Sequence, residues 1–382
     1  MSFKQITRKI TGDAPGRTTE LHYFRIGPKR KAGVPKVYLQ AALHADEQPG
    51  IMVLHHLLGM LRAADERDEL AAEFVVMPMV NPLGMANLGF NQHQGRYDSV
   101  SGKNFNRNWL RLFPLIKNQL GDKLGSNPDK NKRLVLKLLG ESLKAIKPVS
   151  ALEQQRHWVT LEAYDADYVF DLHCDNDALI HIFAVPQLSD EMQALADWIG
   201  SAGTLLAEDS GGGSFDEVWP SLWLDLKKEY RAAAIPMPPI AATLEYRGQS
   251  DVFDELNEQD DIQLYAYFQA QGLITGEPVD AEKMFAPEPT DLDATEMVRV
   301  DQAGLLAYKV ELGDIVEKGQ LIAELVKLEG EGAFLERIEV IAGTSGRIIS
   351  RNTTKYVWPG CSVAKIVGTE KLESRGDYLL ED

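Results

Sequence analysis

The chain has 382 residues, with 57 acidic and 40 basic side chains that give a net charge of −17. A surface of this sign repels nucleic acid and anionic membranes, so neither is an expected partner. The two cysteines are too few for a disulfide-built scaffold or a cysteine-only zinc site. The length favours two domains.

The N-terminal residues contain no apolar core of a signal peptide, and no run of about 18 apolar residues occurs anywhere in the chain. The longest apolar stretch, residues 51–61, is interrupted by His55 and His56. We therefore expect a cytoplasmic protein. The sequence does not predict its oligomeric state.

Up to about residue 275, short apolar runs alternate with segments of helical period, which predicts an α/β fold with a mostly parallel sheet. Strands are expected at 36–43, 73–79, 167–172, 180–185 and 241–246. Apolar residues at helical spacing predict helices within 51–61, 136–146 and 262–268, the last ending before Gly272.

The composition changes at residues 276–293, which are rich in proline and acidic residues and lack any period. We place a domain boundary there, with a catalytic domain at 1–283 and an all-β domain at 284–382. In the second domain, residues 316–325 align with 357–366 as two copies of a V-x-x-G turn followed by an apolar run. This repeat resembles the barrel sandwich of biotinyl and lipoyl domains. Lys327 lacks the sequence setting of a modified lysine, so we interpret it as a surface residue.

Candidate metal ligands begin with His44 and Glu47, directly after the first predicted strand. If the chain turns there, these two residues lie on one face, whereas an extended chain would pair His44 with Asp46. Pro49 and Gly50 favour the turn.

A third candidate ligand, His173, ends an apolar strand at the sheet edge where α/β proteins bind ligands. Two histidines and one carboxylate form the ligand set of a catalytic zinc site. Cys174 should face the other way and pack internally. Asp171 either supports His173 or is a solvated strand end.

Two further groups suit substrate chemistry. Asn106 and Arg107 could bind a carboxylate, although a polar loop with a surface arginine would look the same. Glu245 lies within an apolar run, where a carboxylate is costly unless it is paired or functional. It is either a general base or an ion-pair partner of Arg247.

With the motifs HADE, NFNRNW, DLH and TLEYR in this order, the chain resembles the succinylglutamate desuccinylase/aspartoacylase family of the zinc carboxypeptidase-like group. The resemblance implies a three-layer α/β domain with a mixed, mostly parallel sheet and an appended β-domain. It also implies one zinc ion held by His44, Glu47 and His173.

The same resemblance implies that Glu245 acts as the general base, that Asn106 and Arg107 bind the substrate carboxylate, and that an arginine, Arg96 by its order in the chain, polarises the scissile carbonyl. The expected activity is removal of an acyl group from a small, carboxylate-bearing N-acyl amino acid. The alternatives are a metallocarboxypeptidase and a binding protein without activity. Residues 110–160 match no motif and are interpreted as an insertion near the site.

Overall fold

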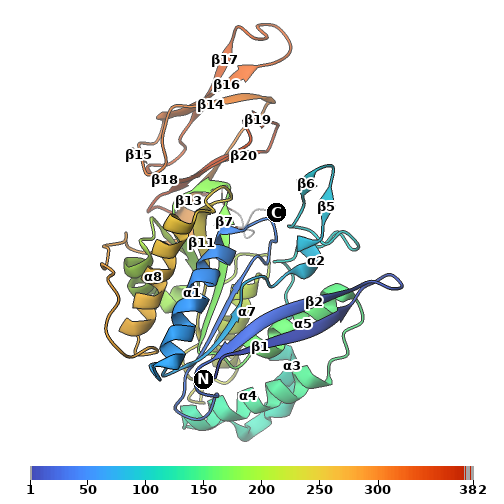
Figure 1. Ribbon diagram of the computed structural model, residues 1–382. Coiled ribbons are helices and arrows are strands. Elements are labelled where there is room, and N and C mark those ends of the chain that lie inside the picture. Colours follow the sequence, from blue (N-terminus) through green and yellow to red (C-terminus); the bar gives the residue numbers. More distant parts are fainter. Residues whose placement is uncertain (1, 374, 376–378, 380–382) are drawn as a thin grey trace.

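A computed structural model describes residues 2–373, 375 and 379 of the chain (Figure 1). A large mixed sheet covered by helices forms the first part, and two small antiparallel sheets form the C-terminal part. The predicted α/β class with an all-β C-terminal part is confirmed.

The central sheet is mixed and mostly parallel. Within the described residues its strands are, in spatial order, β1 (Lys4–Thr11), β2 (Thr18–Ile26), β4 (Glu73–Met77), β3 (Lys36–Ala41), β7 (Tyr168–Asp175), β11 (Ile240–Gly248), β9 (His181–Ala184), β10 (Thr204–Leu206) and β12 (Thr290–Asp291). Only the pairs β1–β2, β2–β4 and β11–β9 are antiparallel. The five predicted strands are present, and the N-terminal hairpin β1–β2 is an addition that the sequence analysis did not predict.

Side chains of successive strand residues point to opposite sides of this sheet, and helices cover the apolar residues on both sides. One face packs against α1 (Pro49–Glu66), α6 (Ser189–Ile199) and α8 (Asp254–Ala270). The other packs against α3 (Phe113–Leu120), α4 (Pro128–Ala145), α5 (Ala151–Ala163) and α7 (Phe215–Glu229). Residues 110–160 thus supply most of the second helical layer. None of the described helices has the length and apolar character needed to cross a membrane.

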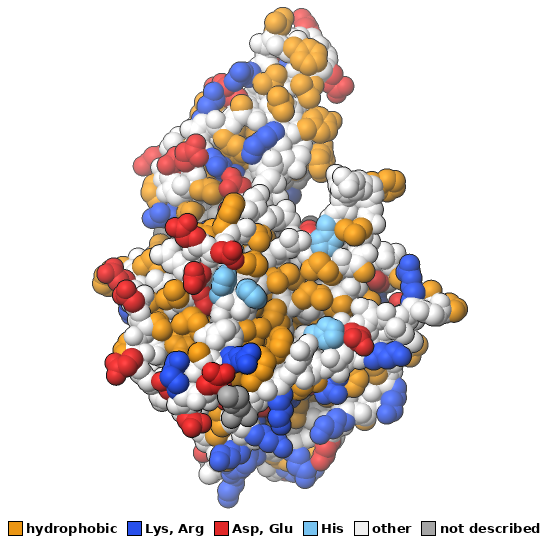
Figure 2. Space-filling view, in the orientation of Figure 1, with side chains coloured by type: hydrophobic (Ala, Val, Ile, Leu, Met, Phe, Trp, Pro, Cys, Tyr) orange, Lys and Arg blue, Asp and Glu red, His pale blue; other side chains and the backbone are white. Residues whose placement is uncertain are grey.

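Short elements complete this part of the chain. They are α2 (Pro82–Met85), β5 (Leu88–Gly89), β6 (Gln92–His93), β8 (Asp177–Ala178) and the 3-10 turns at Gly121–Lys123, Pro186–Leu188 and Leu292–Ala294. The β5–β6 hairpin projects from the surface, and a notch separates it from the C-terminal part (Figure 2).

The C-terminal part consists of two sheets of equivalent order. One contains β13 (Thr295–Arg299), β20 (Ser362–Val367), β18 (Gly346–Arg351) and β15 (Ile315–Val316), and the other contains β17 (Arg337–Ile341), β16 (Leu321–Lys327), β14 (Gly304–Tyr308) and β19 (Tyr356–Val357). Each two-residue strand pairs with a strand of the other half, β15 with β18 and β19 with β14. The repeat read from the sequence therefore corresponds to a pseudo-twofold arrangement.

Matching glycines explain how the two halves fit together. A Cβ atom on Gly304 would lie 2.7 Å from the carbonyl oxygen of Val326, and one on Gly346 would lie 2.1 Å from that of Val367. Both positions therefore require glycine for close backbone approach. Lys327 pairs with Glu336 at 2.9 Å, as a surface lysine would.

Several contacts join the two parts. Strand β12 pairs with β10 in the central sheet, β8 pairs with β18, and Leu292 packs with Leu205 and Ile349. The domain boundary near residue 284 stays a prediction, and a fragment ending there would lack the edge strand β12.

Candidate functional site

The predicted site residues gather at the carboxyl edge of the central sheet. His44 follows β3, His173 lies on β7, and Glu245 lies on β11 directly beside His173 in the strand register. Because these three strands are parallel neighbours, their carboxyl ends meet at one edge.

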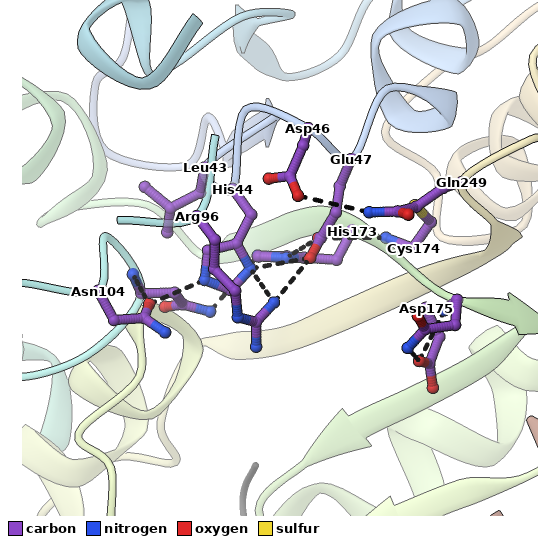
Figure 3. Close-up of polar contacts among 12 residues, drawn as sticks. Leu43, His44, Asp46, Glu47, Arg96, Asn104, His173, Cys174, Asp175 and Gln249 are labelled. Atoms are coloured by element: carbon purple, nitrogen blue, oxygen red, sulfur yellow. Dashed lines mark hydrogen bonds and ion pairs between the residues drawn. The ribbon is translucent and has the colours of Figure 1, made fainter. Parts of the chain in front are cut away.

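The three predicted metal ligands form one buried group. The Glu47 N–H donates to the carbonyl oxygen of His44 at 3.1 Å, so the chain turns as predicted and does not continue as a strand. His44 Nδ1 lies 2.9 Å from Glu47 Oε1, and His173 Nδ1 lies 2.6 Å from Glu47 Oε2 (Figure 3). Ligand atoms of all three residues lie within 4.8 Å of one another. This arrangement could hold a metal ion.

Asn104 determines which nitrogen of His44 faces this group. Its Oδ1 accepts the backbone N–H of Asn106 at 2.8 Å and lies 2.9 Å from His44 Nε2. Since Oδ1 is an acceptor, Nε2 carries the hydrogen in the neutral imidazole and the lone pair of Nδ1 points at Glu47. Two acceptors then face each other, an arrangement that a cation or a hydrogen-bond donor between them would stabilise. Asn104 was not among the predicted site residues, although it lies two positions before Asn106 in the same motif.

Asp171 is the charged neighbour of His173. It is fully buried, and its Oδ2 lies 2.9 Å from His173 Nε2. Burial alone would lower the pKa of His173, but Asp171 and Glu47 raise it well above the usual value. Asp171 is therefore a support for His173 and not a solvated strand end. The negative charge around the imidazole would equally attract a metal ion in place of the proton.

Glu245 lies beside His173 in the strand register, on the same face of the sheet, and its half-buried side chain lines the same cavity. Burial, followed by repulsion from Glu47, raises the pKa of its carboxyl group to about 8. The alternative of an ion pair with Arg247 is wrong. The strand register is irregular after Glu245, Arg247 has a positive φ of 62°, and its Nη1 binds Asp260 Oδ2 at 2.6 Å.

The loop of residues 104–108 places Asn106 and Arg107 beside the three predicted metal ligands, His44, Glu47 and His173, which we call the metal-type group. Asn106 Oδ1 accepts the N–H of Phe215, the first residue of α7, at 2.8 Å, which leaves its Nδ2 directed at His173 Nε2, 3.4 Å away. The Arg107 Nη1 donates to the Asn106 carbonyl oxygen at 2.9 Å, and Arg107 is buried. Neither residue belongs to an exposed surface loop.

Arg96 reaches the same group from the loop after the β5–β6 hairpin. Its Nη1 lies 3.2 Å from both His44 Nδ1 and Glu47 Oε1 (Figure 3). The guanidinium thus already contributes positive charge next to the two acceptors.

These side chains line one cavity of about 390 Å³. All seven predicted site residues line it, namely His44, Glu47, Arg96, Asn106, Arg107, His173 and Glu245. The C-terminal part contributes Thr295, Met297 and Lys365 to the wall. Lys365 was not predicted as a site residue, because the repeat that contains it carries no signal for chemistry.

Lys365 connects the C-terminal part to the cavity edge. Its Nζ binds Asp175 Oδ2 at 2.5 Å, and both side chains are largely buried. Despite burial, Lys365 and His181 hold the pKa of Asp175 below its usual value. Because an unfolded aspartate has a pKa of about 3.9, the pair stabilises the fold above about pH 4 and progressively less as the pH falls further.

We expect Lys365→Met to lower the free energy of unfolding by about 3 kcal/mol at neutral pH, because it leaves Asp175 buried without its cation. Urea unfolding at pH 7 measures the loss. The control is Lys309→Met, which removes a more exposed ion pair with Glu324 and should cost less than about 1 kcal/mol. Equal losses in the two variants would contradict a special role for Lys365.

A three-layer α/β domain with a buried His–Glu–His group at the carboxyl edge of a mixed sheet has the architecture of the zinc carboxypeptidase-like class. A sequence model of the Succinylglutamate desuccinylase/Aspartoacylase catalytic domain matches residues 33–254, more than half of the chain. The protein belongs to this family, whose names describe hydrolases that cleave the amide bond of acyl amino acids.

Solved structures share the whole fold. A protein of Shewanella frigidimarina NCIMB 400, provisionally described as a succinylglutamate desuccinylase/aspartoacylase, is 20% identical with a TM-score of 0.79, covering 96% of this chain and 97% of its own. A family protein of Shewanella amazonensis SB2B is 22% identical with a TM-score of 0.77, covering 95% and 98%. The product-bound ectoine utilization protein EutE (DoeB) of Ruegeria pomeroyi is 17% identical with a TM-score of 0.65, covering 96% and 95%. A search of curated proteins gave no match.

Proposed function

We propose that this protein is a zinc-dependent amidohydrolase that removes the acyl group from a small N-acyl amino acid. One observation carries the proposal: the His44–Glu47–His173 group shares its cavity with an additional carboxyl group on Glu245 and with the Asn106–Arg107 pair. A metal site, a proton acceptor and a carboxylate-binding pair are the parts that such a reaction needs.

The residues present fit zinc. His44 and His173 offer Nδ1 atoms, and Glu47 adds a carboxylate between them. On the opposite side, Asn104 Oδ1 is hydrogen-bonded to His44 Nε2, and Asp171 is an ion-pair neighbour of His173 Nε2. Two nitrogens and one oxygen with an accessible cavity are the donor set of catalytic zinc sites. When bound, zinc supplies a Lewis acid and makes a water molecule more acidic.

Glu245 would move the protons. Its Oε2 is buried with no hydrogen-bond partner within the described residues, so it is available to accept a proton from water and return it to the leaving amine. The pKa of about 8 reflects burial and the negative charge of Glu47. It would fall once a divalent cation offsets that charge, leaving Glu245 ionised as a base near neutral pH.

The arginines would bind and polarise the substrate. Arg107 and the Nδ2 atom of Asn106 offer donors to a substrate carboxylate, which would fix the scissile amide over the metal-type group. Arg96, beside Glu47, would stabilise negative charge that develops on the carbonyl oxygen.

The C-terminal wall of the cavity favours a deacylase over a carboxypeptidase. A peptidase needs an open groove for the residues that precede the scissile bond, whereas Met297 and Lys365 border this cavity. Enclosure also excludes water from a small-molecule reaction. A small N-acyl amino acid is therefore the substrate class we propose.

A substrate panel tests this choice. We expect the zinc-loaded protein to release amino acids from N-acetyl or N-succinyl derivatives and to leave peptides longer than three residues intact. Amine release detected by mass spectrometry measures both. Efficient trimming of long peptides from the C-terminus would instead support a carboxypeptidase.

Arg107→Ala tests the carboxylate-binding pair in the same assay. We expect kcat/KM to fall by a factor equivalent to about 2–5 kcal/mol of transition-state stabilisation, since the substrate carboxylate would be buried without a partner. Arg111→Ala, which removes an exposed ion pair with Asp225, should change little.

A further inference from the structure

We infer that Arg156, on α5, is a positioning residue that holds the loop of residues 104–108 in the geometry that substrate binding requires. This inference rests on the proposed function, because the loop carries the Asn106–Arg107 pair. Arg156 lies outside the four sequence motifs, in the segment that no motif explains.

A single guanidinium contacts most of the loop backbone. Arg156 Nη2 lies within hydrogen-bond distance of the carbonyl oxygens of Asn104 at 3.1 Å, Phe105 at 3.0 Å and Arg107 at 2.8 Å, so its two hydrogens are shared among three acceptors. Its Nη1 donates to the carbonyl oxygen of Asn108 at 3.1 Å. Four carbonyl groups from five consecutive residues therefore converge on one side chain.

The chemistry of arginine suits this task. A planar guanidinium carries several donors in fixed directions, whereas a lysine ammonium could satisfy only part of the set. The guanidinium carbon lies 5.1 Å from the centre of the Trp109 ring, which supports it from one side. Burial lowers the pKa of Arg156 to about 10, so the group stays protonated at neutral pH. Within the described residues no carboxylate pairs with it, and the carbonyl oxygens are its hydrogen-bond acceptors.

The loop connects this contact to the chemistry at the sheet edge. Asn104 orients His44 through Nε2, and Asn106 and Arg107 face the cavity. The loop has other attachments, because the N–H groups of Asn108 and Trp109 donate to the carbonyl oxygens at positions 212 and 213. Losing the guanidinium should thus loosen the loop without unfolding the protein, and small displacements at a site cost large factors in rate.

Hydrogen–deuterium exchange tests the effect on the loop directly. In zinc-loaded Arg156→Ala we expect faster hydrogen exchange in peptides that cover the loop residues 104–109. Exchange in the strands of the central sheet should not change. Arg111→Ala is the matched control, since Arg111 lies in the same segment and binds Asp225 at the surface. Unchanged exchange in the loop, or faster exchange throughout the molecule, would overturn the inference.

Kinetics supply the second readout. We expect Arg156→Ala to raise KM by about tenfold to a hundredfold with a smaller change in kcat, and Arg156→Lys to be intermediate. Added methylguanidine should lower KM for Arg156→Ala and not for wild type. An unchanged KM, or a KM that methylguanidine does not lower, would count against positioning. If the wild type cleaves no N-acyl amino acid, the proposed function fails, while the exchange experiment still decides whether Arg156 holds the loop.

Discussion

Glu245→Gln should retain zinc while its turnover falls by about 10²–10⁴-fold. Glutamine keeps the size of the side chain and cannot accept a proton, so the variant separates proton transfer from metal binding. Since Glu245 is outside the His44–Glu47–His173 group, its loss removes no ligand. Metal analysis of the purified variant and kcat on the best acyl amino acid measure the two effects.

Another carboxyl group of the same cavity provides the matched control. Glu217 lines the cavity, and burial, followed by the charge of Asp216, raises its pKa to about 7. It lies on α7, away from the register position shared by Glu245 and His173. We expect Glu217→Gln to keep kcat within about threefold. Wild-type turnover in Glu245→Gln, or an equal loss in both variants, would contradict the assignment of Glu245 as the base.

The strands that determine the position of the site could be predicted because they are buried on both faces. All residues of β3 and β4 are buried, so both sequences are mostly apolar. The polar exceptions are Lys36, Gln40 and Glu73. Strands β1 and β2 escaped prediction for the opposite reason. Strand β1 is the edge strand and β2 lies next to it, and most residues of β1 are exposed, which allows lysine, arginine and threonine to occupy it.

The metal-type group was predictable because its signals are local. The spacing of His44 and Glu47, with Pro49 after them, is enough to predict the turn that brings the two side chains together. By contrast, the alternative of an ion pair between Glu245 and Arg247 assumed a regular strand, in which residues two apart share a face. The irregular register after Glu245 and the positive φ of Arg247 break that regularity, and the sequence contains no signal of either.

The contacts that complete the site join residues far apart in the chain. Asn104 lies 60 positions from His44, and Lys365 lies 190 positions from Asp175. No periodicity or spacing rule connects such residues, because their proximity results from the order of strands and the docking of the C-terminal part. Arg156 is the same case, since its partners are backbone carbonyls that carry no sequence signature.

Metal content should depend on the three predicted ligands. We expect about one zinc per chain, because the described residues contain one group of this kind. Replacing His44 or His173 with alanine removes a nitrogen ligand and leaves Glu47 with one imidazole, which is too few donors for a tight site. Both variants should lose most of the zinc and the activity. Metal analysis after dialysis measures the loss, and adding zinc to chelator-treated wild type should restore turnover.

Cys174 provides the control for these variants, since it is adjacent to His173 on β7 and equally buried. Burial raises the pKa of its thiol, which keeps it protonated and unsuited to binding a metal. Cys174→Ala should therefore keep about one zinc per chain, with any cost confined to packing stability. If Cys174→Ala lost zinc as His173→Ala does, the thiol would belong to the ligand set. If His44→Ala and His173→Ala both retained zinc, the metal would bind elsewhere, and the assignment of the site at the edge of β3 and β7 would fail.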